Sequence, residues 1–163
     1  MEKDIYSAPK ADLNNDVTVG PLASRWARLF GSIVDSLIMG LVMLPIMYFT
    51  GYFDGFADGN QPSLVHAFAL GLAGCLAFVL INWHFLKTSG QTIGKKALGT
   101  KIVTDTDQLP DTPTLLKRYG VYFGLSMVPI IGSILSLLNI VFIFGGEKKC
   151  LHDRAAVTKV VKA

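Results

Sequence analysis

The chain has 163 residues, a formal net charge of +3 and a mean hydropathy of +0.45, and 51% of its residues are hydrophobic while only 17% are charged. A soluble domain has about 25% charged residues, so this composition leaves too little charge to cover a surface that faces water. It excludes an ordinary soluble enzyme, a disordered chain and a nucleic-acid-binding protein. We therefore expect an integral membrane protein whose main partner is the lipid bilayer.

Three long apolar stretches predict the membrane-embedded part of the chain. After a polar N-terminal tail over residues 1–22, one membrane domain is expected over residues 23–163. Its apolar stretches cover residues 29–53, 64–86 and 119–145, and a spanning helix needs about 20 mostly apolar residues. The expected fold is an all-α transmembrane bundle with two long spans, a third apolar stretch and a small cytoplasmic pair of β-strands.

Basic residues predict the orientation of the first two spans. The segment 87–118 carries six Lys or Arg residues, whereas the loop after the first stretch contains Asp54 and Asp58 and neither Lys nor Arg. Cytoplasmic loops carry an excess of Lys and Arg. The N-terminus and the basic segment are therefore expected in the cytoplasm.

The third apolar stretch allows two topologies. A single crossing would place the Lys-rich C-terminal tail, residues 147–163, outside the cell, against the distribution of basic residues. Pro129 can instead break the stretch. Helices over about residues 113–127, capped by Thr112, and residues 131–144 would then form a hairpin that returns the tail to the cytoplasm. We favour the hairpin over the single crossing.

Two short segments predict the cytoplasmic strand pair. Residues 98–103 and 157–161 are rich in β-branched residues, and residues 104–108 are typical of a turn. Pairing requires both segments to lie on one side of the membrane, which agrees with the hairpin. The alternative is that both segments are solvated extensions without regular structure.

Asp35 is an acidic residue inside the first apolar stretch. A carboxylate within a span costs about 2.5–3.5 kcal/mol on insertion scales, so it requires protein or water around it. Arg28 lies about two helical turns earlier on nearly the same face, with Ser32 between them. A direct bond would stretch both side chains, so each is expected to have another partner. Alternatively, Arg28 reaches the lipid headgroups and Asp35 stays hydrated.

Other polar residues suggest helix contacts rather than a cofactor site. Asn82 and Asn139 lie in the second and third apolar stretches and are candidate hydrogen-bonding residues between helices. No cluster of His, Cys, Asp and Glu has the spacing of metal ligands, so we expect neither a metal nor another cofactor.

The glycine-rich segment 90–96 (GQTIGKK) differs from a nucleotide-binding loop. Three residues rather than four separate its glycines, and no Ser or Thr follows the first lysine. A basic turn at the headgroup level can instead hold lipid phosphates.

Three motifs resemble the RDD family of small bacterial-type membrane proteins, which is named for one arginine and two aspartates. The motifs are ASRWARL at residues 23–29 with Asp35, the segment 90–96 with the strand that follows it, and LHDRAAVT at residues 151–158. The resemblance covers about residues 22–161 and matches Arg28, Asp35 and Asp153 to the residues that give the family its name. It implies a multi-pass protein of the inner (cytoplasmic) membrane.

The chain departs from the family pattern at Val157. The family often has Ala-Gly-Thr where this chain has Ala156-Val157-Thr158. The geometry of this turn is therefore left open by the resemblance.

Two functions remain, and we expect neither to be enzymatic. The resemblance implies monovalent cation/proton antiport by an oligomer, in which Asp35 would be the protonatable carboxylate and Arg28 would tune its pKa. The alternative is a non-catalytic scaffold or assembly subunit for another membrane protein. There Asp35 would dock the first span, and Asp153 would hold the tail against the segment 90–96 through Lys95 or Lys96.

The candidate residues fall into two groups. The coupling site or structural polar core comprises Arg28, Ser32, Asp35, Asn82, Asn139 and Asp153. The candidate lipid-headgroup or tail-docking site comprises Gly90, Gln91, Thr92, Gly94, Lys95, Lys96, His152 and Arg154.

Overall fold

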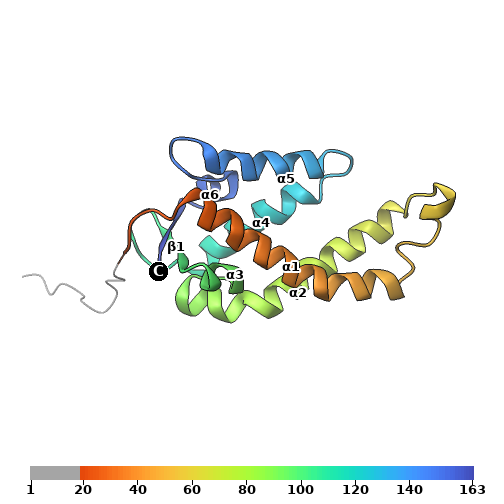
Figure 1. The fold of residues 1–163 in the computed structure, drawn as a ribbon, viewed down its shortest axis with the longest axis horizontal. Coiled ribbons are helices and arrows are strands. Elements are labelled where there is room, and N and C mark those ends of the chain that lie inside the picture. The colour runs from red at the N-terminus through yellow and green to blue at the C-terminus, as the bar shows by residue number, and fades with distance from the viewer. Residues whose placement is uncertain (1–18) are drawn as a thin grey trace, which may run out of the picture.

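The computed structural model describes residues 19–163 as a mostly helical chain (Figure 1). Most of the expected N-terminal tail lies outside the described residues. Helices α1 (Arg25–Phe49) and α2 (Leu64–Ser89) are both long and apolar enough to cross a membrane. The loop between them contains the short 3-10 helix η2 (Phe56–Asp58). These two helices agree with the two long spans that the sequence predicts.

The third apolar stretch is divided into two short helices. Helix α4 (Thr112–Ser126) is followed by a turn that contains Pro129, and then by α5 (Gly132–Val141), which continues as the 3-10 helix η3 (Phe142–Phe144). Helices α4 and α5 pack against each other. The structure therefore has the hairpin and not a single long helix.

The cap of α4 differs from the prediction. The Asp111 carboxylate accepts a hydrogen bond from the backbone N–H of Thr114 at 3.0 Å, and Thr112 is the first residue of the helix. Asp and Thr are both good capping residues, so the sequence alone did not place the boundary to one residue.

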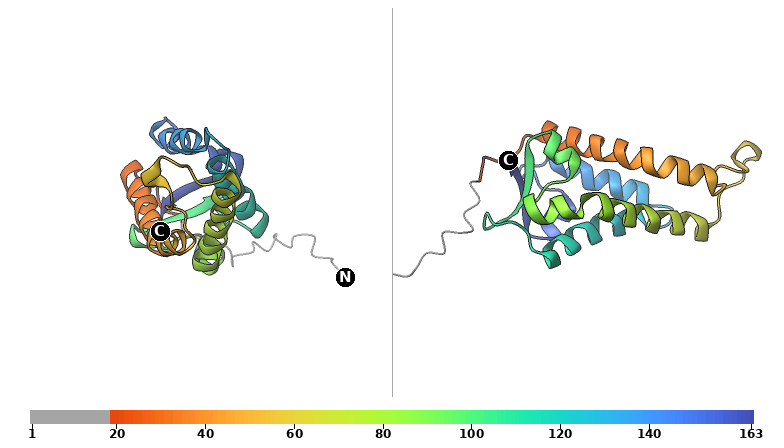
Figure 2. Two further views of the ribbon diagram at one scale, coloured as in Figure 1. Left: turned by 90° about the vertical axis from the view of Figure 1, so that its right-hand side faces the viewer. Right: turned by 90° about the horizontal axis from the view of Figure 1, so that it is seen from below.

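The remaining elements gather at one end of the molecule, away from the α1–α2 loop (Figure 2). They are the short helices α3 (Ile93–Ala97) and α6 (Leu151–Ala155), and the strands β1 (Thr100–Thr104) and β2 (Thr158–Lys162). The strands pair in antiparallel register, with Ile102 opposite Val160. The predicted strand pair is confirmed, with boundaries shifted by one or two residues.

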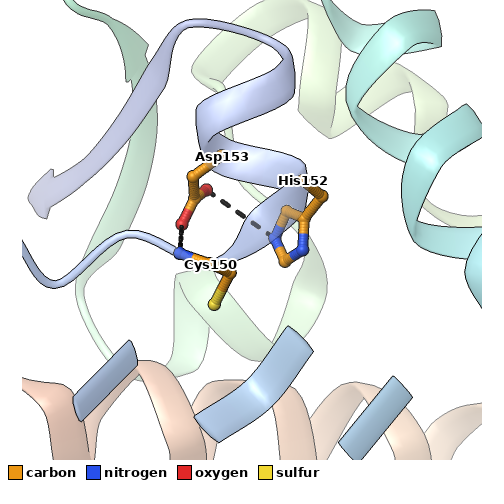
Figure 3. A group of neighbouring side chains, drawn as sticks. All are labelled: Cys150, His152 and Asp153. Carbon is orange, nitrogen blue, oxygen red and sulfur yellow. Dashed lines mark hydrogen bonds and ion pairs between the residues drawn. The ribbon is translucent and has the colours of Figure 1, made fainter. Parts of the chain in front are cut away.

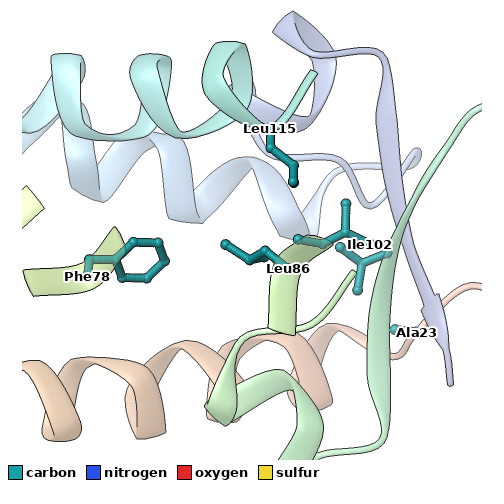
Figure 4. Packing of buried hydrophobic residues seen from close by; sticks show 6 residues of the cluster. Ala23, Phe78, Leu86, Ile102 and Leu115 are labelled. Carbon is teal, nitrogen blue, oxygen red and sulfur yellow. The ribbon is translucent and has the colours of Figure 1, made fainter. Parts of the chain in front are cut away.

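The densest packing lies where the helices meet this sheet. Leu86, Ile102 and Leu115 are at most 1% exposed and pack with Ala23, Phe78 and Val160 (Figure 4). By contrast, α1 and α2 leave large apolar side chains exposed along much of their length. Apolar side chains exposed on helices of this length are suited to contact with lipid. The end of the molecule that carries α3, α6, β1 and β2, here named the sheet end, is therefore a small packed unit. The long helices extend beyond it.

Helix α3 approaches α1 closely at Gly94. A Cβ atom on Gly94 would lie 2.1 Å from the carbonyl oxygen of Gly31 and 2.8 Å from the Asp35 carboxylate. Only glycine allows this approach without displacement of one of the two helices. The second glycine of the segment 90–96 therefore brings α3 against the acidic residue of the first span.

The turn between α6 and β2 holds Val157 in the left-handed region, with φ of 54°. Its side chain is 57% exposed. A β-branched residue is unfavourable in this conformation, which glycine adopts readily. The chain therefore carries backbone strain at the position where the family often has glycine.

We expect Val157→Gly to stabilise the protein by about 1 kcal/mol, because the strain is relieved and little buried apolar surface is lost. Gly99→Ala is the matched control, since Gly99 has φ of 59° and open space around it. It should destabilise by a similar amount. Thermal unfolding of the detergent-solubilised variants measures both effects, and an unchanged or lower melting temperature for Val157→Gly would contradict the strain.

Candidate functional site

Asp153 lies at the centre of a buried ionic cluster. Its Oδ2 atom accepts a hydrogen bond from Arg28, and its Oδ1 atom is ion-paired with Arg118. The backbone N–H of Cys150 donates to Oδ2 at 2.9 Å. Asp153 is 0% exposed, Arg28 7% and Arg118 1%. One carboxylate of α6 thereby connects α1, which carries Arg28, to α4, which carries Arg118.

The two guanidinium groups have further partners inside the chain. Arg28 donates to the carbonyl of Lys148, and Arg118 donates to the hydroxyl of Thr158. Burial alone raises the pKa of Asp153, but Arg118 and Arg28 outweigh it and hold that pKa below its ordinary value. The cluster of Arg28, Arg118 and ionised Asp153 carries one excess positive charge.

This cluster corrects the sequence prediction in two respects. Asp153 does not hold the tail through Lys95 or Lys96, because both of its oxygens face arginines. Arg118 was not among the candidate residues. It is one of six Lys or Arg residues in the segment 87–118, and no spacing in the sequence connects it to Asp153.

Asp35 binds the segment 90–96 and not the C-terminal tail. Its carboxylate accepts hydrogen bonds from the Thr92 hydroxyl at 2.5 Å and from the Gly94 backbone N–H at 2.7 Å. The Nζ atom of Lys95 lies 4.0 Å from the same carboxylate. Asn82 of α2 supports the segment from the other side, since its Oδ1 atom accepts from the Ile93 N–H at 3.0 Å. Arg28 and Asp35 therefore each have their own partner, as the sequence predicts.

The segment 90–96 is internal rather than a headgroup site. Gly90, Gln91, Thr92 and Gly94 are buried, and the Gln91 side chain donates to the Thr100 carbonyl at 2.9 Å. The polar groups of Gln91, Thr92 and Gly94 have partners inside the chain, so these residues differ from the exposed headgroup contact that the sequence suggests.

The basic residues around this segment differ in exposure. Lys96 is exposed, and its ammonium lies over the Phe85 ring. Arg154 is exposed and pairs with Glu147 at 3.4 Å. Lys95, in contrast, points toward Asp35 and is only 15% exposed. Two neighbouring lysines therefore have different surroundings.

His152 is bound to Asn139 rather than to a lipid surface. The Asn139 Oδ1 atom accepts from the His152 backbone N–H at 3.3 Å and lies 3.0 Å from its Nδ1 atom. Burial lowers the pKa of His152 to about 3, and the nearby Arg118 acts in the same direction. Asn139 thus links α5 to α6, as an interhelical hydrogen-bonding residue should.

Cys150, His152 and Asp153 form a compact group of possible metal ligands within the part of the chain that the structure describes (Figure 3). Their ligand atoms lie within 4.8 Å of one another. To bind a metal here, Cys150 would have to be a thiolate and the Asp153 carboxylate would have to be free. Burial raises the pKa of Cys150 to about 11, and Arg28 and Arg118 occupy Asp153. The arrangement fits a structural contact better than a metal centre.

A cavity of about 330 Å³ lies between α1, α2 and α4, and the charged residues meet at one of its walls. Its polar lining includes Ser32, Asp35, Thr92, Lys95, Arg118 and His152. Its apolar lining includes Met39, Met43, Gly71, Phe78 and Phe123. The Ser32 hydroxyl donates to the Arg28 carbonyl of its own helix at 3.0 Å. The cavity therefore combines an acid–lysine pair with apolar and aromatic walls, and it is the candidate functional site.

We expect Asp153→Asn to destabilise the protein by about 3–5 kcal/mol, because it leaves two buried guanidinium groups without a counter-charge. Glu147→Gln removes an exposed carboxylate paired with Arg154 and should change stability by less than about 1 kcal/mol. Both are measured by thermal unfolding in detergent and by the yield of folded protein in membranes. Equal stability of the two variants would show that the cluster does not hold α1, α4 and α6 together.

Acidification below pH 6.5 should destabilise the protein through His152. The unfolded state takes up this proton near pH 6.5, whereas the folded state does so only near pH 3. Between these values stability should fall with decreasing pH by up to about 1.4 kcal/mol per pH unit. Melting temperatures from pH 7.5 to 5 measure the slope. His152→Gln should flatten it, whereas the same change at exposed His84 should leave it unaltered.

Comparison with known proteins gives one result that covers most of the chain. The searches of curated proteins and of solved structures found no match. The family model of the RDD family matches residues 22–157. This range contains α1, α2, the cavity and all three residues of the buried cluster. The chain therefore belongs to the RDD family of membrane proteins.

Proposed function

We propose that this protein exchanges a proton for a monovalent cation at the pair formed by Asp35 and Lys95. The observation that carries the proposal is that an acid and a lysine lie 4.0 Å apart on the wall of a cavity beside the spanning helices. Their side chains are 14% and 15% exposed. Ionisable groups at such positions are expensive to bury and are characteristic of ion pathways.

The exchange follows from the charge balance of this pair. Protonated Lys95 neutralises the Asp35 carboxylate. When Lys95 releases its proton to solvent, its amine becomes neutral and the carboxylate attracts another cation into the cavity beside it. One proton leaves for each cation that enters, so the net charge of the cavity stays constant.

The surroundings of Lys95 favour proton release near neutral pH. Burial lowers the pKa of Lys95 to about 8, although Asp35 acts to raise it. Arg118 and Arg28 lower it further, and Asp153 acts in the opposite direction. A lysine whose pKa lies near the working pH can exchange its proton, whereas an ordinary lysine stays charged.

A complete pathway requires more than one copy of the chain. Helices α1 and α2 continue past the α4–α5 hairpin, so beyond it they have no further helix from the described part of the chain beside them (Figure 2). A homo-oligomer in the inner membrane, with both termini of each chain in the cytoplasm, would supply the missing walls. The excess of basic residues at the sheet end supports this orientation.

A scaffold function is the second candidate, and one observation favours it. Both oxygens of Asp35 already accept hydrogen bonds from the segment 90–96, at 2.5 and 2.7 Å. In this view Asp35 holds α3 against α1, and the sheet end contacts another membrane protein. No ion would then be exchanged.

Lys95→Arg separates the two functions. Arginine keeps the positive charge beside Asp35 but does not release a proton in proteins. We expect cation-driven proton efflux from proteoliposomes to fall at least tenfold, while the protein stays folded. Lys96→Arg is the matched control and should retain the flux within twofold, because Lys96 lies outside the cavity lining.

The flux is followed with a pH-sensitive dye enclosed in the vesicles, after addition of NaCl or KCl at pH 8. The absence of flux from the unmodified protein with inorganic and organic monovalent cations alike would favour the scaffold. Equal flux from both lysine variants would contradict the role of Lys95.

A further inference from the structure

We infer that the cation taken by this cavity is an organic ammonium ion with an apolar body, rather than an alkali metal ion. The inference rests on the proposed exchange at Asp35 and Lys95 and specifies its substrate class. Three properties of the cavity carry it: its size, the chemistry of its walls and the presence of one carboxylate among its described lining residues.

The cavity is larger than an inorganic ion needs. Its volume of about 330 Å³ compares with roughly 30 Å³ for one water molecule in the liquid. Small-molecule sites occupy about 300–1,000 Å³ and combine apolar walls with a few polar groups. The cavity fits the lower end of that range.

The apolar walls of the cavity suit an organic cation. Met39 and Met43 come from α1, Phe78 from α2, and Phe123 from α4. The Phe78 ring packs against Phe123 with centroids 5.3 Å apart. Aromatic rings attract alkylammonium groups, and methionine side chains adapt to irregular apolar shapes. An ammonium group at Asp35 would place its apolar substituents along these side chains.

Within residues 19–163, the polar wall offers a single anionic ligand to a cation. Ion-selective sites replace the hydration shell with several oxygen atoms. The lining also carries hydroxyl groups, from Ser32, Ser36, Thr92, Tyr119, Tyr122 and Ser126, but these are neutral ligands. Asp35 is the acidic residue among the described residues that line the cavity. One carboxylate balances the charge of an organic ammonium ion, whose alkyl substituents need no oxygen ligands and fit the apolar walls.

The charges around the cavity also permit an organic cation to replace the Lys95 proton. Arg118 lines the same cavity, and the excess positive charge of the Arg28, Arg118 and Asp153 cluster would oppose an additional cation. An organic ammonium that replaces the Lys95 proton adds no net charge, so this opposition does not increase. The alternative is that the cavity binds an anion, which would balance the charge of Arg118.

The probe is benzyltrimethylammonium, which has no dissociable proton and therefore cannot carry protons across the bilayer as a free base. Binding of the radiolabelled ion to the full chain in detergent is measured by equilibrium dialysis at pH 7 and pH 9. We expect at least fivefold tighter binding at pH 9. Asp35→Asn should weaken binding at least tenfold, whereas the matched control Asp105→Asn, outside the cavity, should leave it within twofold.

The same vesicle assay compares proton flux driven by benzyltrimethylammonium, Na⁺ and K⁺. The organic ion should reach half-maximal flux at a concentration at least tenfold lower than either alkali ion.

The outcomes distinguish the inference from the proposed function. Proton flux with Na⁺ or K⁺ but no binding of benzyltrimethylammonium would overturn the substrate class and leave the exchange intact. Binding that depends on pH and Asp35, without flux for any cation, would support the site and overturn the exchange. Tighter binding of benzenesulfonate than of benzyltrimethylammonium would show an anion site and overturn the inference.

Discussion

A single buried carboxylate, Asp153, holds the sheet end of this protein together. It pairs with Arg28 of α1 and Arg118 of α4, and all three side chains are almost inaccessible to solvent. Removing charges from water is costly, and the cost is offset only when opposite charges meet with good geometry. The chain must therefore bring α6 to the junction of α1 and α4, or leave buried arginines without a partner. The position of the C-terminal tail follows from this requirement.

The second acidic residue, Asp35, connects segments that are closer together in the sequence than Arg28 and Asp153. It binds the segment that follows α2, and Gly94 allows that segment to approach α1 without a side chain between them. As a result Lys95 faces the cavity while Lys96 is exposed. The two aspartates thus have separate functions in the fold: Asp153 attaches the tail to the helices, and Asp35 places a lysine beside the cavity.

Several elements follow from local sequence patterns. The lengths of the apolar runs predict α1 and α2, and Pro129 predicts the break between α4 and α5 because proline lacks the N–H that an interior helix residue donates. Pro45, in contrast, lies inside α1 near its end. The β-branched segments predict β1 and β2. These patterns depend on neighbouring residues, so they can be interpreted without knowledge of the fold. The segment 90–96 shows the limit of this approach: its lysines and glycines suggest a headgroup contact, yet most of it is buried because Asp35 and Asn82 bind its polar groups.

The sequence by itself determined that this is a helical membrane protein, that an acidic residue lies inside its first span, and that Arg28 and Asp35 need different partners. Only the tertiary structure decided which partners they have. Arg28 and Asp153 are 125 positions apart in the chain, and Arg118 is one of several basic residues near the apolar helices. Charge pairing has no sequence period, since any arginine can satisfy any carboxylate that the fold brings near it. The choice of Arg118, and with it the polar wall of the cavity, is therefore a property of packing.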